Sequence, residues 1–282
     1  MKINGWTYYN HAAIPTTPPH QEPDISPIKN KSIWKIDGTP LLARWTTEFD
    51  CGYETNWWYV IKDTPFDISE LKAKRRYEIT KGLKNFNVIK INPLDFKEEL
   101  YEVTVAAFSA YPKKYRPTIN KQSFISSLET WENYILFGAF SRETNELCGY
   151  AWVLNETNGY LNFTMLKVKP KYEKTAVNAA LVEGILRYFN DFLKNGCYIC
   201  DGARSIIHKT AFQDYLEKYF GFRKAYCKLK ITYNPRFKLV IKILFCFRRL
   251  FFKFDRIKII HSLNSIFRME EIAKSNENDK HF

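Results

Sequence analysis

Hydrophobic and polar positions follow two different periods along residues 93–233, and together they predict a mixed series of helices and strands. Apolar residues recur at helical spacing after Pro93, while three later stretches alternate with the period of a strand. In chain order the predicted elements are two helices (LDFKEELYEVTVAAFSAY and KQSFISSLETWEN), three strands (YILFGAF, LCGYAWVLNET and GYLNFTMLKVKP), a long helix ending at Gly196, strand CYICDGAR, helix HKTAFQDYLEKYF and strand FRKAYCKLKITYN. This order predicts a mixed α/β fold in which helices flank a central sheet.

The first 92 residues predict a smaller group of elements. Two strand-like stretches, SIWKIDG and LLARWTT, flank Asp37-Gly38 and predict a hairpin. WWYVIKD and FNVIKIN predict two further strands. Between them, Asp67 has the position of an N-cap, and Glu70 completes the spacing of a capping box for a helix that Gly82 ends or kinks.

Residues 10–40 are rich in Pro, Thr and His and predict an extended loop without regular structure. His11 and His20 lie in this loop, close to Tyr8 and Tyr9. Long irregular loops in compact domains are often functional, so this one could cover an acceptor pocket. A loose terminus is the alternative interpretation.

Composition restricts the class of protein and of partner. The chain has 282 residues, of which 45% are hydrophobic, which is enough for a packed core. Basic residues outnumber acidic ones by 43 to 30, and the net charge of +13 favours anionic partners: nucleic acid, acidic lipid or phosphorylated small molecules.

The N-terminus and the cysteines favour a cytoplasmic protein. MKINGWTYYNH has no apolar run typical of a signal peptide. The six cysteines lack the spacing of a disulfide framework and are expected to be reduced. Cys197 and Cys200 form a lone CxxC pair without a second ligand pair, and the Tyr and Ile between them favour a strand over a metal or redox site.

Residues 236–260 have an unusual combination of charge and apolar periodicity. Eight basic residues and one acidic residue give this segment a charge of +7, and its apolar positions repeat at helical spacing (240, 243, 244, 247, 250, 251, 254 and 257). The internal charges argue against a transmembrane span and favour an amphipathic helix on an anionic membrane surface. A helix docked on the protein's own sheet, or a dimer contact, is the alternative. The polar C-terminal EEIAKSNENDKHF is expected to fray.

Several short sequence segments within residues 93–233 resemble motifs of the GNAT acyltransferase superfamily. FGAF and LCGYAWV resemble its second and third strands, LNFTMLKVKP its fourth, and Val168-Lys-Pro170 the Val-x-Pro that opens its cofactor loop. YLEKYFGFRKAY resembles its C-terminal signature. The resemblance implies a GNAT-like core that uses acyl coenzyme A as donor.

In that family the cofactor loop carries an Arg or Gln and then two glycines, and the amides at the following helix bind the pyrophosphate. Here the matching positions are Glu173, Ala176 and Asn178, which place a negative charge and two β-carbons where the anion would lie. Nearby lysines could compensate, and an ordinary strand-to-helix turn with lysines in solvent is the alternative. The residues that the resemblance implies for cofactor binding are Leu166, Lys167, Val168, Lys171, Lys174, Thr175, Ala176, Val177 and Asn178.

The same resemblance implies where catalytic groups would lie. The splayed end of the fourth strand would supply a backbone N–H to the substrate carbonyl, and a Tyr on the last helix would protonate the leaving thiolate. Tyr215 is the preferred acid and Tyr219 the second choice, although both miss the commonest family spacing to Gly221. His208, which follows the strand carrying Asp201, is a candidate base.

The string DISELKAKRRYEITKGLKNFNV resembles a helix of Fem-type peptidoglycan aminoacyltransferases, which carry two GNAT-like halves. This partial resemblance implies an aminoacyl-tRNA donor and a lipid-linked acceptor. The expected organisation is a shortened GNAT-like half over 1–92, a GNAT-like acyltransferase domain over 93–235 and an amphipathic tail over 236–282.

Three functions remain open. The first is an N-acyltransferase that moves an acyl group, acetyl by preference, from acyl coenzyme A to an amine of a small-molecule or lipid-linked acceptor in the cell envelope. The second is a Fem-type aminoacyl-tRNA-dependent transferase. The third is a non-catalytic membrane-associated binding protein with a decayed GNAT fold. Nucleic acid other than aminoacyl-tRNA is not expected, because the basic residues do not alternate with stacking aromatic residues.

Overall fold

The computed structural model describes residues 1–111, 113, 116–155, 159–206 and 211–278. The chain divides into two compact units that are interleaved in sequence. The first unit comprises Met1–Val60, Ala203–Thr210 and Lys224–Phe282, and the second comprises Ile61–Gly202 and Ala211–Arg223. These bounds differ from the linear division expected at residues 92 and 235. Strands that are distant in sequence pair with one another, and this pairing draws the last strand into the first unit.

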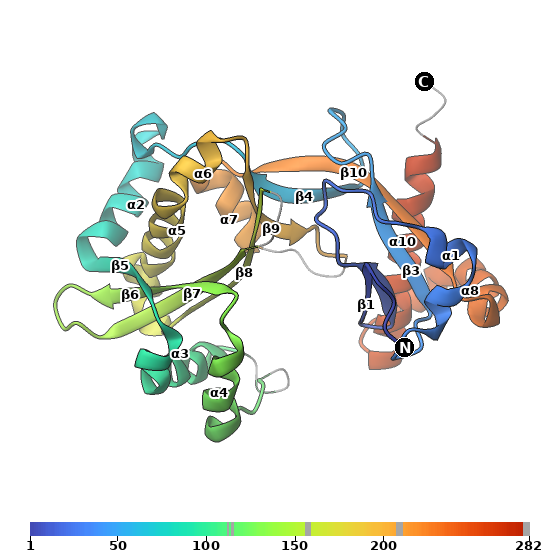
Figure 1. The fold of residues 1–282 in the computed structure, drawn as a ribbon, viewed down its shortest axis with the longest axis horizontal. Helices are drawn as coiled ribbons and strands as arrows, with labels where there is room; N and C mark the ends of the chain where they lie inside the picture. Colours follow the sequence, from blue (N-terminus) through green and yellow to red (C-terminus); the bar gives the residue numbers. More distant parts are fainter. Residues whose placement is uncertain (112, 114–115, 156–158, 207–210, 279–282) are drawn as a thin grey trace. The chain divides into compact units, whose positions relative to one another are not determined.

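The first unit is a sheet with helices from both ends of the chain (Figure 1). Its elements are β1 (Trp6–Tyr9), β2 (Ala12–Pro15), α1 (Ser26–Lys29), the 3-10 helix η1 (Ser32–Lys35), β3 (Leu42–Thr47), the start of β4 (Trp57–Lys62), β10 (Arg223–Tyr233), α8 (Pro235–Cys246), α9 (Arg248–Phe252) and α10 (Lys258–Asn278). Its strands lie in the order β1-β2-β3-β10-β4. β1 and β2 form an antiparallel hairpin, β2 runs parallel to β3, and β3 is antiparallel to β10.

Side chains of β3 alternate between two cores on opposite faces of this sheet. Ala43 packs with Trp6, Ala13 and residues around η1 in one core. Leu42 packs in the other core with Met269 of α10 and with residues of α8 and β10. The C-terminal helices are therefore an integral part of the first unit.

Two sequence-based predictions for the first unit are wrong. The strand predicted over SIWKIDG does not form, because Ser32–Lys35 forms η1, whose Ile33 is fully buried. The short apolar run fits a buried turn as well as a strand. The expected loop at residues 10–40 also contains β2, α1 and η1, and hydrogen bonds order it, including one from Trp6 Nε1 to the Asp24 carbonyl (2.9 Å).

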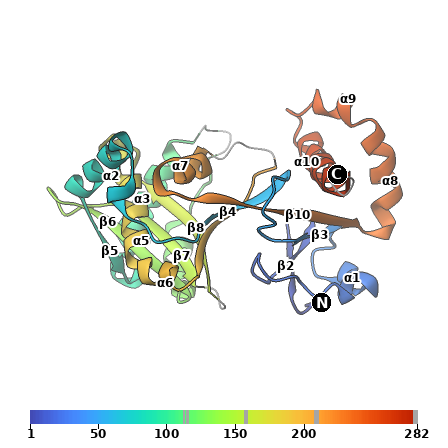
Figure 2. The same cartoon turned by 90° about the horizontal axis from the view of Figure 1, so that it is seen from above.

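The tail also differs from the single amphipathic helix expected. It forms three helices, α8, α9 and α10, because the chain turns after Phe247 and again between Lys253 and residue 257. Figure 2 shows α8 and α9 beside α10. Aromatic contacts join them, with Phe267 of α10 lying 5.8 Å from both Phe245 and Phe251, measured between ring centroids. The predicted fraying of the last segment is also wrong up to residue 278, because α10 extends to Asn278.

The second unit is a mixed sheet with helices on it (Figure 1). Its strands lie in the order β9-β8-β7-β6-β5, antiparallel except for the parallel pair β8–β9. Its elements are η2 (Ile68–Glu70), α2 (Ala73–Asn85), β5 (Phe86–Ile91), η3 (Pro93–Phe96), α3 (Lys97–Ser109), α4 (Lys121–Ser127), η5 (Leu128–Thr130), β6 (Tyr134–Ser141), β7 (Leu147–Asn155), β8 (Tyr160–Val168), η6 (Pro170–Thr175), α5 (Val177–Tyr188), α6 (Asn190–Lys194), β9 (Tyr198–Ala203) and α7 (Ala211–Phe220).

The order of elements predicted over residues 93–233 is confirmed, and the chain is a mixed α/β protein with C-terminal helices. Three local details differ. The long helix is divided at Phe189 into α5 and α6. Asp67 caps only the short η2, by accepting from the Ser69 amide (2.7 Å), and α2 begins later, at Ala73. Gly82 does not end α2, which continues to Asn85.

Candidate functional site

Strands β8 and β9 separate after a short stretch of pairing. The parallel register joins Tyr160 to Tyr198 and ends at the pair Asn162–Cys200. Residues 163–168 of β8 continue to pair with β7 on the other side, with a register shift between Trp152 and Val153. One edge of the outer half of β8 therefore has no partner from β9, as the GNAT resemblance implies for the fourth strand.

The direction of the β8 amides follows from the alternation of an antiparallel ladder. The Lys169 amide donates to the carbonyl of Cys148 (N···O 2.8 Å). Hydrogen-bonded and non-hydrogen-bonded pairs alternate, so Lys167 also bonds to β7 while Leu166 and Val168 do not. The amides of Leu166 and Val168 therefore point away from β7, toward the side where β9 has separated.

Asp201 follows the last paired residue of β9. Burial raises the pKa of its carboxyl to about 7, and a hydrogen bond with Gln213 opposes that rise. Gln213 is a buried residue of α7, so two elements fix the position of this carboxyl. A carboxylate with a pKa near neutral pH can both accept and return a proton, which is the property of a general acid–base group.

Aromatic residues of α7 line the same region. Phe212 lies 5.7 Å from Phe163 of β8, and Tyr215 lies 4.9 Å from Tyr219, measured between ring centroids. Burial raises the pKa of Tyr215, and the negative charge of Glu78 on α2 adds to the rise. Tyr215 therefore keeps its proton at neutral pH, as an acid must. His208 lies outside the described residues.

Backbone hydrogen bonds within the loop occupy two amides of the segment expected to bind the cofactor pyrophosphate. Residues 170–175 form the 3-10 helix η6, in which the amides of Tyr172 and Ala176 donate to the carbonyls of Lys169 and Glu173. Ala176 has the left-handed φ of 67° that a glycine would adopt more easily, and it is buried. The side-chain oxygen of Asn178 is also buried and has no hydrogen-bond partner among the described residues.

Helix α2 packs directly against this loop and against α5. Lys81 Nζ donates to the Lys174 carbonyl (2.7 Å), and Asn85 Nδ2 donates to the Thr175 carbonyl (3.2 Å). A Cβ on residue 82 would lie 2.6 Å from the carbonyl oxygen of Ala176, so this close approach requires Gly82. The loop is held by protein groups on the α2 side.

Most of the lysines near the loop already have partners. Lys169 Nζ donates to Glu146 Oε1 (2.8 Å), and Lys171 Nζ and the Tyr172 hydroxyl donate to its Oε2 (3.2 and 2.5 Å). These contacts, with Lys169 the strongest, lower the pKa of Glu146 to about 2. Lys167 Nζ lies 3.9 Å from the ring centroid of Phe108, and burial lowers its pKa.

The structure thus divides the predicted site residues. Leu166 and Val168 lie on the separated edge of β8, while Lys171, Thr175 and Ala176 belong to a self-contained turn, and Val177 begins α5 as a buried residue. Lys174 is exposed, and its carbonyl is bound by Lys81. Sequence reasoning missed Gln213 and undervalued Asp201. The available signal was an acidic residue within an apolar strand, because burying a carboxylate costs free energy unless it has a function.

Among solved structures the chain is similar to L-PGS from Bacillus licheniformis, with 12% identity over 85% of this chain and 83% of that chain and a TM-score of 0.50. It is also similar to the C-terminal domain (DUF2156) of a protein from Agrobacterium fabrum described as a lysylphosphatidylglycerol synthetase, with 10% identity over 84% and 82% of the two chains and a TM-score of 0.50. At these identities the likeness establishes a shared fold across most of both chains.

A tandem GNAT protein from the clavulanic acid biosynthesis pathway matches with 11% identity over 79% of this chain and 76% of that chain, with a TM-score of 0.42. No family model matches the sequence, and no curated protein matches it.

The burial of Asp201 predicts a pH dependence of stability. Because its folded pKa, about 7, exceeds its ordinary value of 3.8, the folded state retains a proton that the unfolded chain has lost. The contribution of Asp201 to the free energy of unfolding is therefore largest below pH 4. It declines as pH rises to 7, by up to about 1.4 kcal/mol per pH unit. We expect Asp201→Asn to remove this decline in urea-unfolding curves between pH 4.5 and 7.5. Asp214→Asn, at an exposed position of α7, is the control; parallel curves for Asp201→Asn and the parent chain would contradict the assignment.

Proposed function

We propose that this protein is an acyl-group transferase of the GNAT type, with an aminoacyl-tRNA as donor and the headgroup of an anionic phospholipid as acceptor. The observation that carries the proposal is the separated end of β8 and β9, where the amides of Leu166 and Val168 and the carboxyl of Asp201 lie on neighbouring strands. The likeness to L-PGS and to the lysylphosphatidylglycerol synthetase domain supports the choice of donor and acceptor.

The proposed reaction is the exchange of one ester for another. A headgroup hydroxyl attacks the ester carbonyl of the aminoacyl-tRNA while the Asp201 carboxylate takes the hydroxyl proton. The carbonyl oxygen gains negative charge, and the amides of Leu166 and Val168 donate hydrogen bonds to it. When the intermediate collapses, the bond to the ribose oxygen breaks, and that oxygen takes a proton from Asp201 or from Tyr215. An amine acceptor would react in the same way and give an amide.

The cofactor loop favours this donor over coenzyme A. A pyrophosphate needs free amides and cations at the start of α5, but η6 uses its own amides, Lys169 and Lys171 are held by Glu146, and α2 packs against the loop. Acyl coenzyme A remains the second candidate donor. It is supported by Val168-Lys-Pro170 and by the first amides of α5, which have no partner within the helix. A non-catalytic protein is the third reading, and loss of Asp201 would then change no rate.

The surface of α8 and α9 supports a membrane acceptor. Apolar side chains of these helices divide into two sets. Ile241, Phe245 and Phe251 face the first unit's core or Phe267. The other set, which includes residues of the turns at 247 and 253–257, is exposed, and exposed basic residues alternate with it along the chain. The exposed apolar residues are Leu239, Val240, Ile243, Phe247, Leu250, Phe254 and Ile257, and the exposed basic residues are Arg236, Lys238, Lys242, Arg249, Lys253 and Arg256.

This pattern matches a helix that lies in the interface of an anionic bilayer, with apolar side chains inserted and each basic residue adding about 1 kcal/mol. Docking on the protein itself explains only the inward set. Among the described helices none has the length and apolar character needed to cross a bilayer.

The transferase proposal predicts that Asp201→Asn lowers the rate about 10²- to 10⁴-fold, because a general base is lost. The assay measures radiolabel moved from bulk tRNA charged with a labelled amino-acid mixture to phosphatidylglycerol vesicles. Tyr215→Phe should lower the turnover number with little change in KM, and Tyr77→Phe, at an exposed position of α2, is the matched control. Full activity of Asp201→Asn would contradict the role of Asp201 as general base.

The donor assignment predicts that acetyl coenzyme A neither transfers label nor binds at millimolar concentration. Calorimetric titration measures the binding. The double variant Glu173→Gln/Ala176→Gly restores the side chains expected of a coenzyme A loop and tests whether the site is merely weakened. If the parent chain binds acetyl coenzyme A with a micromolar Kd, the donor is acyl coenzyme A, as the sequence resemblance first implied.

The membrane surface predicts co-sedimentation with phosphatidylglycerol vesicles and weaker pelleting with phosphatidylcholine vesicles. Phe247, Leu250 and Phe254 are 57%, 55% and 50% exposed, so replacing all three by Ser should reduce pelleting severalfold and leave stability nearly unchanged. A matched control replaces Ile89, Leu94 and Val105, exposed apolar residues of the second unit, by Ser. Equal pelleting of the two triple variants would rule out this surface.

A further inference from the structure

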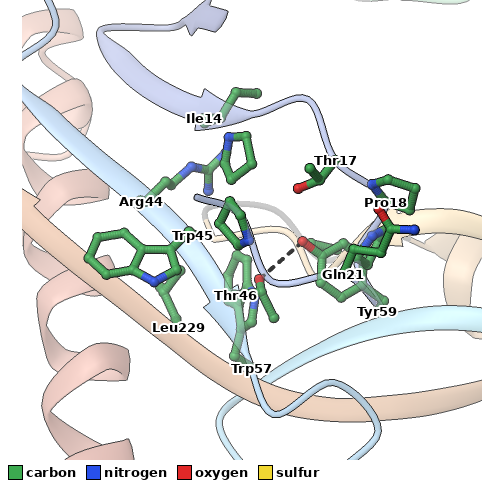
Figure 3. Close-up of a pocket in the computed structure, with 14 residues that line it drawn as sticks. Ile14, Thr17, Pro18, Gln21, Arg44, Trp45, Thr46, Trp57, Tyr59 and Leu229 are labelled. Carbon is green, nitrogen blue, oxygen red and sulfur yellow. Dashed lines mark hydrogen bonds between the residues drawn. The ribbon is translucent and has the colours of Figure 1, made fainter. Parts of the chain in front are cut away.

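The first unit contains a cavity of about 130 Å³ between its sheet and the proline-rich segment after β2 (Figure 3). Arg44 and Thr46 of β3, Tyr59 of β4 and Gln21 line it together with prolines of residues 15–23. The segment is ordered by two backbone bonds, from Thr16 to Gly5 and from Gln21 to Pro18 (both 3.0 Å). The proline-rich segment therefore forms an ordered wall of the cavity.

Arg44 is the charged residue of this cavity. Its neighbours on the same face of β3, Leu42 and Thr46, are both buried, and its side chain extends to α10, where Nη1 lies 3.8 Å from the Met269 sulfur. Within the described part of the chain no carboxylate forms an ion pair with Arg44. Burial lowers the pKa of the Arg44 guanidinium, and the nearby Tyr59 and Tyr9 partly offset the effect.

Three acidic residues of the first unit already have partners. Glu270 of α10 accepts from the Tyr233 hydroxyl (2.6 Å) and pairs with Lys274. Glu271 pairs with Arg248, and Glu48 with Lys228. A thioether is a weak acceptor and carries no charge, so Met269 cannot neutralise the partly buried guanidinium. Removing part of a cation from water without a counter-ion costs free energy, which an anion from outside would offset.

The rest of the lining suits an organic group attached to that anion. Trp57, Trp45 and the prolines give the cavity flat apolar walls. The Thr46 hydroxyl and the Tyr59 hydroxyl form a hydrogen bond of 3.2 Å, drawn in Figure 3. The buried indole N–H of Trp57 has no hydrogen-bond partner among the residues described. Such a cavity combines one fixed charge with apolar area, as small-molecule sites commonly do.

We propose that this cavity is a binding site for a small organic oxyanion, a carboxylate or phosphate on a flat apolar body, held by the Arg44 guanidinium. The planar fork of Arg presents parallel N–H donors that match the oxygens of either group. The site belongs to the first unit and is independent of the transferase chemistry proposed for the second unit.

The test uses two probes with the same apolar body, benzoate and phenyl phosphate, with neutral benzamide as the control and sodium chloride to match ionic strength. Thermal unfolding and tryptophan fluorescence of the full chain report binding, because Trp45 and Trp57 line the cavity. We expect one or both anions to raise Tm and change the fluorescence, with benzamide inactive. A preference for phenyl phosphate identifies a phosphate ligand, and a preference for benzoate a carboxylate.

Arg44→Met should weaken this binding at least tenfold, and it should not lower Tm without ligand, because it removes a partly buried charge that forms no ion pair within the described residues. Arg44→Lys, which keeps the charge but loses the fork, covers the case in which the Met variant fails to fold and should bind more weakly than the parent. Arg249→Gln, at an exposed position, is the control. No response of the parent chain to either anion, equal binding of benzamide, or unchanged binding by both Arg44 variants would overturn the proposal.

Discussion

The early end of the β8–β9 pairing is the constraint on which the candidate site depends. If the two strands continued side by side, the amides of Leu166 and Val168 would be consumed by the sheet, and no donor would remain for a substrate oxygen. Pairing with β9 ends at Asn162–Cys200. Pairing with β7 continues and orients those two amides toward the side on which β9 no longer pairs. Asp201 follows the last residue of β9 that pairs with β8, and the desolvation of its carboxyl there raises its pKa.

Helix α2 restricts what the loop after β8 can bind. Its Gly82 allows a backbone approach to Ala176 that any side chain would block, and Lys81 and Asn85 bind carbonyls of the neighbouring turn. A glycine at 176 would relieve a left-handed residue of about 1 kcal/mol of strain, yet the chain has Ala there. The loop is thus built for packing against α2, and the opening at β8 can serve a donor that does not need this loop for its phosphate.

The sequence was a good guide wherever an element buries one continuous face. Periodicity placed every helix and strand of residues 93–233 in order, because one-sided burial leaves a period of about 3.6 or 2 in the chain. It failed at Ser32–Lys35, where a short apolar run fills a buried 3-10 turn. It also could not rank Asp201 or find Arg44. At both positions the informative property is what surrounds the charged side chain in the folded protein. Gln213 lies beside Asp201, and segments distant in sequence surround Arg44.

The two kinds of basic residue in the first unit argue for two different anionic partners. Between residues 236 and 257 the exposed cations alternate along the chain with exposed apolar side chains, so water solvates them until a large charged surface approaches, and no single position is decisive. Arg44 is partly buried and forms no ion pair within the described residues, so we propose that a group small enough to enter the cavity offsets its desolvation. A bilayer surface cannot enter a space of about 130 Å³. Under these two proposals, the net charge of +13 combines a diffuse attraction to anionic surfaces with a localised site for a small anion.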